Sequence, residues 1–144
     1  MKKTEELLKT IQSCKNYQDF ISESRQELIS VRKLGEAFQE ILTQKKLKKS
    51  DVIRNSGIDR GYAYDILSDK KQPSRDKVLL LCLGASFSFE EVQTLLKQTG
   101  YPMLYARIAR DSAIIFAFRH HMSPIDTNDM PYLFVKSSAA LNFT

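Results

Sequence analysis

The 144-residue chain has little of several residue types that mark specialised protein classes. Its two cysteines, Cys14 and Cys82, are too few for a disulfide framework and favour a reducing, cytoplasmic setting. Five glycines and four prolines exclude collagen-like and low-complexity chains. No apolar run approaches the roughly 18 to 20 residues that cross a bilayer, and the start lacks the apolar segment of a secretory signal. We therefore expect a soluble protein with the length of one ordinary domain and no membrane contact.

The motifs of catalysis and metal binding are also absent. The sequence contains no CxxC, HExxH, GxSxG, P-loop or GxGxxG pattern. The adjacent His120 and His121 would point about 100° apart on a helix, so they could not hold one ion together. The paired carboxylates Glu5–Glu6 and Glu90–Glu91 lie in expected first helical turns, where the helix dipole explains them. We therefore expect no enzyme activity, no cofactor and no metal site.

Helical spacing recurs along the chain, whereas strand signals are scarce. No six-residue segment between turn pairs alternates apolar and polar residues. Between Lys33 and Lys45, apolar residues fall on a single stripe, as in a helix that covers a core. Ser88 and Glu91 form a capping box that opens another helix, which stops at Gly100. The sequence predicts an all-α fold.

We divide the chain into an N-terminal helical extension (1–32), a central domain (33–99) and a C-terminal helical extension (100–144). Helix starts in the two extensions are predicted at polar residues that can accept a hydrogen bond from a backbone N–H, namely Thr4, Asn16, Asp111 and Ser123. The apolar helix from Asp111 to Phe118 has two possible roles, pairing with a second chain or packing on the core. The same holds for the tail residues Tyr132, Leu133, Phe134 and Val135.

The net charge of +5 is confined to the middle of the chain. Residues 1–30 and 81–144 each carry equal numbers of basic and acidic residues, whereas residues 31–80 carry 12 basic and 7 acidic ones. A basic segment between neutral flanks is typical of a surface that binds a polyanion such as nucleic acid. The alternative is a solvated lysine-rich face that keeps the protein soluble.

Two short helices are expected on either side of Gly57. Glycine tolerates a positive φ, so one helix can stop there and another can begin at a steep angle. Asp59 can cap the second helix, which would run from Arg60 to about Leu67. Such a corner suits DNA, because the first helix can lie across the backbone while the second enters a major groove about 12 Å wide.

The run from Leu47 to Ile66 resembles the helix-turn-helix of the phage repressor and Cro type, the XRE family. Gly57 occupies the place of the turn glycine and Asp59 that of the cap. The loop at residues 70–74 and the leucine-rich run that follows are similar as well. The resemblance covers about residues 33–98 and implies a repressor-like five-helix core that binds double-stranded DNA. The chain departs from the family at Lys49, where glutamine is common, and at Asp69, where glycine is common.

The buried face of the second helix, made by Ala63, Ile66 and Leu67, leaves four positions exposed for base contacts. Arg60 suits a bidentate contact with guanine, Tyr64 a thymine methyl group or a phosphate, and Asp65 an amino group of cytosine. The predicted base-contacting residues are Arg60, Gly61, Tyr64 and Asp65. Contacts to the DNA backbone are predicted from the residues at and around the two helices, namely Lys49, Tyr62, Ser68, Lys70 and Lys71.

Each of these residues also has a purely structural interpretation. Arg60 could pair with Asp59 or Asp65 on the surface. The two tyrosines could be packing residues whose hydroxyls reach solvent, and the two loop lysines could be solvated charges.

These features predict a sequence-specific DNA-binding protein, a transcriptional regulator of a bacterium, phage or mobile element. One recognition helix reads only a few base pairs, so we expect a homodimer on half-sites about 34 Å apart. The alternative is an antitoxin-like accessory factor or adaptor of the same fold, which would bind another protein through its terminal extensions. Acidic residues near the groove favour that alternative.

Overall fold

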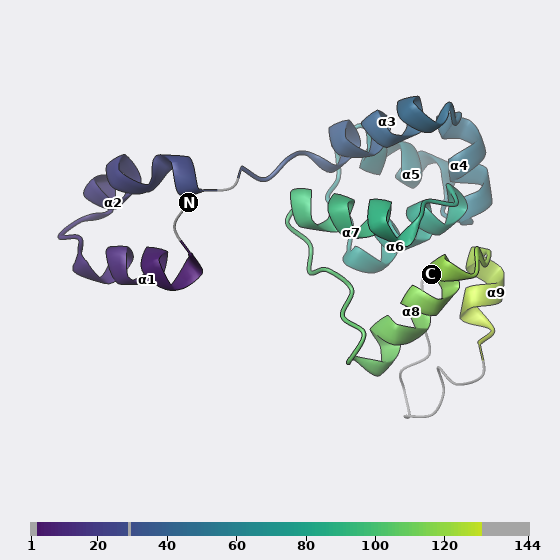
Figure 1. Ribbon diagram of the computed structural model, residues 1–144. Coiled ribbons are helices and arrows are strands. Elements are labelled where there is room, and N and C mark those ends of the chain that lie inside the picture. The colour runs from purple at the N-terminus through teal and green to yellow at the C-terminus, as the bar shows by residue number, and fades with distance from the viewer. Residues whose placement is uncertain (1–2, 29, 131–144) are drawn as a thin grey trace. The chain divides into compact units, whose positions relative to one another are not determined.

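The computed structural model describes residues 3–28 and 30–130, and every regular element in these ranges is a helix (Figure 1). The predicted all-α fold is therefore confirmed for the described residues. The chain divides into two compact units, Met1–Ser30 and Val31–Thr144, which we call the hairpin unit and the main unit.

The hairpin unit contains α1 (Thr4–Ser13) and α2 (Tyr17–Ser24), which pack against each other, and a short 3₁₀ turn, η1 (Arg25–Glu27). Asn16 caps α2 as predicted, since its side-chain oxygen accepts a hydrogen bond of 2.9 Å from the Asp19 backbone N–H. The cap predicted at Thr4 is wrong. Thr4 already belongs to the helix, and the extended backbone of the capping position falls on Lys3, which makes no side-chain cap.

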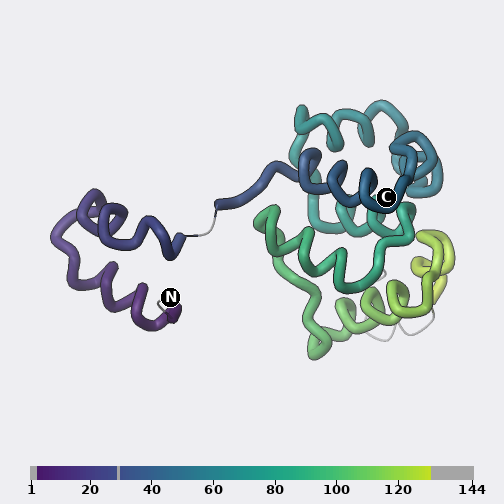
Figure 2. Tube along the Cα trace, turned by 45° about the horizontal axis from the view of Figure 1, so that its top comes forward, coloured from purple at the N-terminus to yellow at the C-terminus, as the bar shows by residue number. Residues whose placement is uncertain are grey.

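The main unit begins with five helices: α3 (Leu34–Lys45), α4 (Lys49–Ser56), α5 (Arg60–Leu67), α6 (Arg75–Gly84) and α7 (Phe89–Gln98). Residues 78–84 of α6 are all buried, so this helix lies in the core. α4 packs on α6, while α3 packs on α5 and α7 (Figure 2). The Phe38 and Phe87 rings meet at the centre with their centroids 4.9 Å apart.

Local caps set the starts of α6 and α7. The Ser74 hydroxyl accepts from the Lys77 backbone N–H, so α6 begins where a polar residue precedes the leucine-rich run. Ser88 and Glu91 make the reciprocal hydrogen bonds of a capping box, which confirms that prediction. Each bond joins groups three residues apart, which is why the sequence alone is sufficient to place these helix ends.

The last two described helices, α8 (Ala109–Arg119) and α9 (Pro124–Asn128), pack on α7 and α6 respectively (Figures 1 and 2). The buried apolar residues of α8 belong to the same hydrophobic core as those of α3–α7, namely Ala113, Ile114, Ala117 and Phe118. Of the two roles considered for residues 111–118, packing on the core is the one observed. The tail residues Tyr132–Val135 lie outside the described residues.

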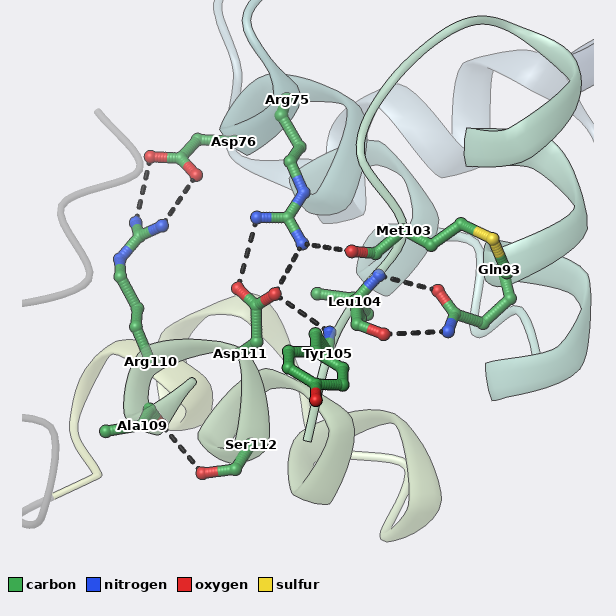
Figure 3. Close-up of polar contacts among 10 residues, drawn as sticks. All are labelled: Arg75, Asp76, Gln93, Met103, Leu104, Tyr105, Ala109, Arg110, Asp111 and Ser112. Carbon is green, nitrogen blue, oxygen red and sulfur yellow. Dashed lines mark hydrogen bonds and ion pairs between the residues drawn. The ribbon is translucent and has the colours of Figure 1, made fainter. Parts of the chain in front are cut away.

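The predicted start of α8 at Asp111 is wrong, because the helix begins at Ala109. The Asp111 side chain is instead buried against α6 (Figure 3). It accepts two hydrogen bonds from the Arg75 guanidinium, at 3.1 and 2.9 Å, and one of 2.9 Å from the Tyr105 backbone N–H. A long-range ion pair has therefore replaced the local cap.

Two further polar contacts hold α8 and the segment before it to α6 and α7 (Figure 3). Arg110 pairs with Asp76 through two hydrogen bonds of 3.0 and 2.8 Å. The Gln93 side chain both donates to and accepts from the backbone of Leu104. We call the pairs Arg75–Asp111 and Arg110–Asp76 the α6–α8 clamp.

The described residues lack membrane-spanning helices and metal-binding clusters. None of the helices there has both the length and the apolar character needed to cross a bilayer. Within the same residues, no three potential metal-ligating side chains gather in one place.

Candidate nucleic-acid interface

The corner between α4 and α5 is held by local hydrogen bonds and one buried side chain. Gly57 ends α4 with a φ of 75°, a left-handed conformation that residues with a side chain rarely adopt. Ile58 follows and is buried. The Asp59 carboxylate then accepts a hydrogen bond of 3.1 Å from the Tyr62 backbone N–H and so caps α5, as predicted.

The corner is also anchored from below, where α4 lies on α6. The Ser56 hydroxyl donates to the Ile53 carbonyl and accepts from the Ile58 N–H. A Cβ atom at Gly84 of α6 would lie 2.8 Å from the Ser56 backbone nitrogen, closer than real Cβ contacts. The absence of a side chain at Gly84 therefore allows α4 to sit directly on α6 and fixes the base from which α5 projects.

One face of α5 is buried and the other is exposed. Ala63, Ile66 and Leu67 face the core, as the sequence predicted, while Arg60 and Gly61 are exposed. Tyr64 and Asp65 are half-buried. The four positions predicted for base contacts therefore lie away from the most buried face of the helix, with Arg60 and Gly61 in its first turn.

The Arg60 side chain contacts an aromatic ring rather than a carboxylate. Its guanidinium carbon lies 5.7 Å from the centroid of the Tyr64 ring, one helical turn further along. None of the ion pairs found among the described residues includes Arg60, so the pairing considered with Asp59 or Asp65 is not observed. A guanidinium on an aromatic face keeps its in-plane N–H donors available for a further acceptor.

A second aromatic contact orients a lysine of the loop after α5. The Lys71 Nζ lies 5.5 Å from the centroid of the Tyr62 ring and 3.6 Å from an Asp65 carboxylate oxygen. The Asp65 backbone carbonyl also accepts from the N–H groups of Lys70 and Lys71. The Ser68 hydroxyl donates to the same carbonyl at 3.3 Å, so all the predicted contact residues of this loop are arranged around the end of α5.

A shallow hollow of about 470 Å³ lies between α4 and α5. Lys49, predicted as a phosphate contact, is half-buried in the first turn of α4. The Arg54 guanidinium is held 2.9 Å from an Asp51 oxygen. Cationic, hydroxyl and aromatic groups therefore share one concave surface, lined by Ser50, Ile53, Arg54, Gly57, Ile58, Arg60 and Tyr64.

Asp69, a departure from the repressor pattern, has a structural role. Its φ of 63° is left-handed, a conformation that aspartate tolerates better than most residues with a side chain. Its carboxylate accepts a hydrogen bond of 2.8 Å from the Gly35 backbone N–H, in the first turn of α3. The negative charge thus stabilises the N-terminus of α3.

Sequence reasoning missed two basic residues near the loop. Arg32 and Lys33 line a second hollow of about 280 Å³ together with Lys71, and Arg32 also pairs with Glu40 at 2.8 Å. The signal available in the sequence was the basic pair immediately before α3, inside the positively charged segment. Partial burial raises the pKa of the Tyr101 hydroxyl beside this hollow, so Tyr101 remains a donor, here to the Pro73 carbonyl at 2.6 Å.

Eleven of the 12 basic residues of the central segment fall into two groups in the structure. Five lie in ion pairs within the protein: Arg32, Lys45, Arg54, Lys71 and Arg75. Six have no ion pair with any residue that the structure describes: Lys33, Lys46, Lys48, Lys49, Arg60 and Lys70. The uncompensated charge lies at the start of α3, in the α3–α4 connection, on α5 and in the loop that follows it.

Comparison of the chain with protein-family models, with curated proteins and with solved structures gave no match. The resemblance to the repressor helix-turn-helix therefore stays a prediction carried by residues 47–66 and the loop after them.

Proposed function

We propose that this protein binds double-stranded DNA in a sequence-specific manner and acts as a transcriptional regulator. The observation that carries the proposal is Arg60, an exposed guanidinium in the first turn of α5 that stacks on Tyr64 and takes part in no ion pair with a described residue. A guanidinium placed at the start of a projecting helix matches the paired acceptors of guanine in the major groove.

The dimensions of α5 agree with this role. An α-helix with its side chains is about 10 to 12 Å in diameter, so α5 fits a major groove about 12 Å wide. Its opposite face is buried in the main unit, so the first turn is the part that would enter the groove. Arg60 and Gly61 would reach furthest into the groove, followed by Tyr64. Asp65 forms an ion pair with Lys71.

The lysines around α5 would supply the affinity that does not depend on sequence. Lys49 begins α4, and Lys70 and Lys71 follow α5, so the cations flank the proposed groove-reading helix. Phosphate contacts fix the register of such a helix and provide much of the binding free energy. Arg32 and Lys33, beside Lys71, extend this proposed phosphate-binding surface.

A salt titration of binding to a random duplex tests the proposal. Three to five phosphate contacts would give a plot of log affinity against log salt with a slope of about −2.7 to −4.5. On a site selected from a random pool, Arg60→Ala should cost about 1 to 3 kcal/mol while barely changing binding to random duplex. Lys49→Ala should weaken both alike and reduce the slope by about 1.

Lys97 provides the matched control for the loss of one positive charge. It is exposed on α7, which packs on α3 and α8 and not on the corner. Lys97→Ala should leave both affinities unchanged. Equal losses from Arg60→Ala on selected and random duplex would place Arg60 on the DNA backbone.

The second candidate function is that of a protein-interaction adaptor. The observation that favours it is the exposure of Leu8, Ile11 and Tyr17 on the hairpin unit. Absent or salt-independent binding to duplex DNA at low salt would favour this function over the first.

A further inference from the structure

Positive charge from two distant segments of the chain gathers at the second hollow, which lies between the start of α3 and the loop after α5. Arg32 and Lys33 come from the residues before α3, and Lys71 comes from the loop. Asp69 is the acidic residue of this lining. Three basic side chains and one acidic one leave an excess of two positive charges around one concave surface.

Two of these cations are held by exposed partners inside the protein. The Arg32 guanidinium donates to Glu40 at 2.8 Å and to the Gln98 side chain at 3.4 Å, which uses two of its five N–H donors. The Lys71 Nζ lies 3.6 Å from Asp65. Both ion pairs are open to solvent, where such pairs contribute little free energy. A bound anion can therefore compete for both cations.

The third cation and the carboxylate of the hollow differ in their contacts. Lys33 is exposed and forms no ion pair with any residue that the structure describes. The Asp69 carboxylate accepts a hydrogen bond of 2.8 Å from the Gly35 backbone N–H. The acidic group is thus directed at the start of α3, and Lys33 is left to meet a ligand.

Apolar side chains form much of the remaining lining. Leu34 and Pro73 are buried, whereas Val31 is 67% exposed. The volume of about 280 Å³ is just below the range of about 300 to 1,000 Å³ that is usual for ligand pockets. Such pockets combine apolar walls with a few charged or polar groups that orient the ligand. The hollow is therefore suited to a small molecule that has both an anionic group and an apolar part.

The charge of the hollow selects the anionic group. A phosphate monoester carries about −1.5 to −2 at pH 7 and presents three acceptor oxygens, which matches two excess positive charges and three cationic side chains. A carboxylate carries only one negative charge and would leave part of the excess. The planar guanidinium of Arg32 also fits two phosphate oxygens at once.

We propose that the second hollow binds a small phosphate monoester with an apolar body, and that this ligand opposes DNA binding. The second part rests on the proposed function, in which Arg32, Lys33 and Lys71 contact DNA phosphates. A ligand that occupies these cations withdraws them from DNA. Because such coupling is reciprocal, duplex DNA should displace the ligand in turn.

Phenyl phosphate, titrated into the full chain without DNA, tests the site independently of DNA binding. At about pH 7.5, where the phosphate is mostly dianionic, we expect a dissociation constant of about 0.1 to 5 mM. The amide NMR signals of residues 31–34 and 69–73 should shift. Phenyl sulfate, a monoanion with the same ring, and inorganic phosphate, which lacks the ring, should each bind at least about fivefold more weakly.

Two variants separate the charge of the hollow from its apolar wall. Lys33→Met should weaken phenyl phosphate at least about fivefold. Lys46→Met is the matched control, since Lys46 lies at the opposite end of α3, is exposed and forms no ion pair with a described residue. It should bind phenyl phosphate like the unaltered chain. Val31→Ser should weaken phenyl phosphate about threefold and leave inorganic phosphate unchanged.

The effect on DNA is measured separately. Saturating phenyl phosphate should lower the affinity for random duplex at least about threefold, relative to sodium sulfate at the same ionic strength. Unchanged DNA affinity with the ligand bound would overturn the second part of the proposal. Binding of phenyl phosphate by a chain that binds no DNA would contradict the proposed function and leave the site itself supported.

Three results without DNA would overturn the site. The first is the absence of amide shifts at residues 31–34 and 69–73 with phenyl phosphate at about 20 mM, well above the expected dissociation constant. The second is equal affinity for inorganic phosphate and phenyl phosphate, which would make the hollow a contact for the DNA backbone alone. The third is equal loss of affinity in Lys33→Met and Lys46→Met.

Discussion

The exposed face of α5 and the α6–α8 clamp use arginine in opposite ways. Arg60 lies on the surface against an aromatic ring and in no ion pair with a described residue, whereas Arg75 makes a bidentate pair with the buried Asp111. Both arginines contribute equally to the basic segment of the sequence. The comparison shows that a positive charge indicates a binding surface only after its carboxylate partners inside the protein are known.

The physical difference lies in solvent access and sequence separation. The side chains of Arg75 and Asp111 are 20% and 5% exposed, so the pair is shielded from salt and holds α8 on α6. An arginine held in this way has few donors left for a phosphate. Arg60 has its stacking partner four residues away on the same helix, and that contact leaves its donors open to solvent.

The largest effect should come from breaking the clamp. Asp111→Ala should reduce the free energy of unfolding by about 3 kcal/mol, because it leaves the Arg75 guanidinium and the Tyr105 N–H without their acceptor. Chemical denaturation measures this loss. Glu40→Ala, which removes the exposed partner of Arg32, is the control and should cost less than about 1 kcal/mol. Similar losses in the two variants would contradict the structural role of the clamp.

A smaller effect, on DNA alone, should come from the ring beneath Arg60. Tyr64→Leu keeps an apolar side chain but removes the cation–π contact, which is worth about 0.5 to 1 kcal/mol at an exposed site. Affinity for the selected site should fall about twofold to fivefold. Tyr62→Leu is the companion variant, because its ring contacts Lys71, and it should weaken selected and random duplex alike. If Tyr64→Leu behaves in the same way as Tyr62→Leu, the stack does not position Arg60 for a base.

The smallest effect concerns a lysine that is both ion-paired, as Arg75 is, and exposed, as Arg60 is. Lys45 belongs to the basic segment but donates to Glu91 at 2.9 Å. Partial burial tends to raise the pKa of the Glu91 carboxyl, but hydrogen bonds from the Ser88 backbone and from Lys45 outweigh it and leave this pKa below its usual 4.5. The resulting stabilisation is complete above pH 4.5 and is lost as the pH falls through the lower folded-state pKa.

Glu91→Gln should therefore flatten the decline of unfolding free energy below pH 4.5, as measured by denaturation at a series of pH values. Lys45→Met should flatten it in part, since the Ser88 hydrogen bonds remain. An unchanged pH dependence in Glu91→Gln would show that this pair does not contribute.

Helix starts were predictable where the cap lies close in sequence. Asn16, Ser74, Ser88 and Ser123 each accept a hydrogen bond from a backbone N–H three residues ahead, so the signal is complete within four residues. Asp111 presents the same local signal, yet its carboxylate binds Arg75, 36 residues away. Competition between a local and a distant partner is invisible to a local pattern.

At the candidate interface, too, local features were predictable and long-range contacts were not. The bounds of α5, its buried face and the capping role of Asp59 were all predicted from spacing. The stack of Arg60 on Tyr64 follows from their separation by one helical turn, although it was not predicted. The hydrogen bond from the Gly35 N–H to the Asp69 carboxylate could not be predicted from the sequence, because it joins the start of α3 to the loop after α5.

The amino-acid order by itself determined that the chain is helical, where most of its helices begin, and that two of them meet at Gly57. These features depend on hydrogen bonds and dihedral preferences within a few neighbouring residues. Only the tertiary structure decided which cations are paired inside the protein and which face solvent. The pairing depends on carboxylates that folding brings near from distant parts of the chain. It therefore cannot be predicted from patterns of neighbouring residues.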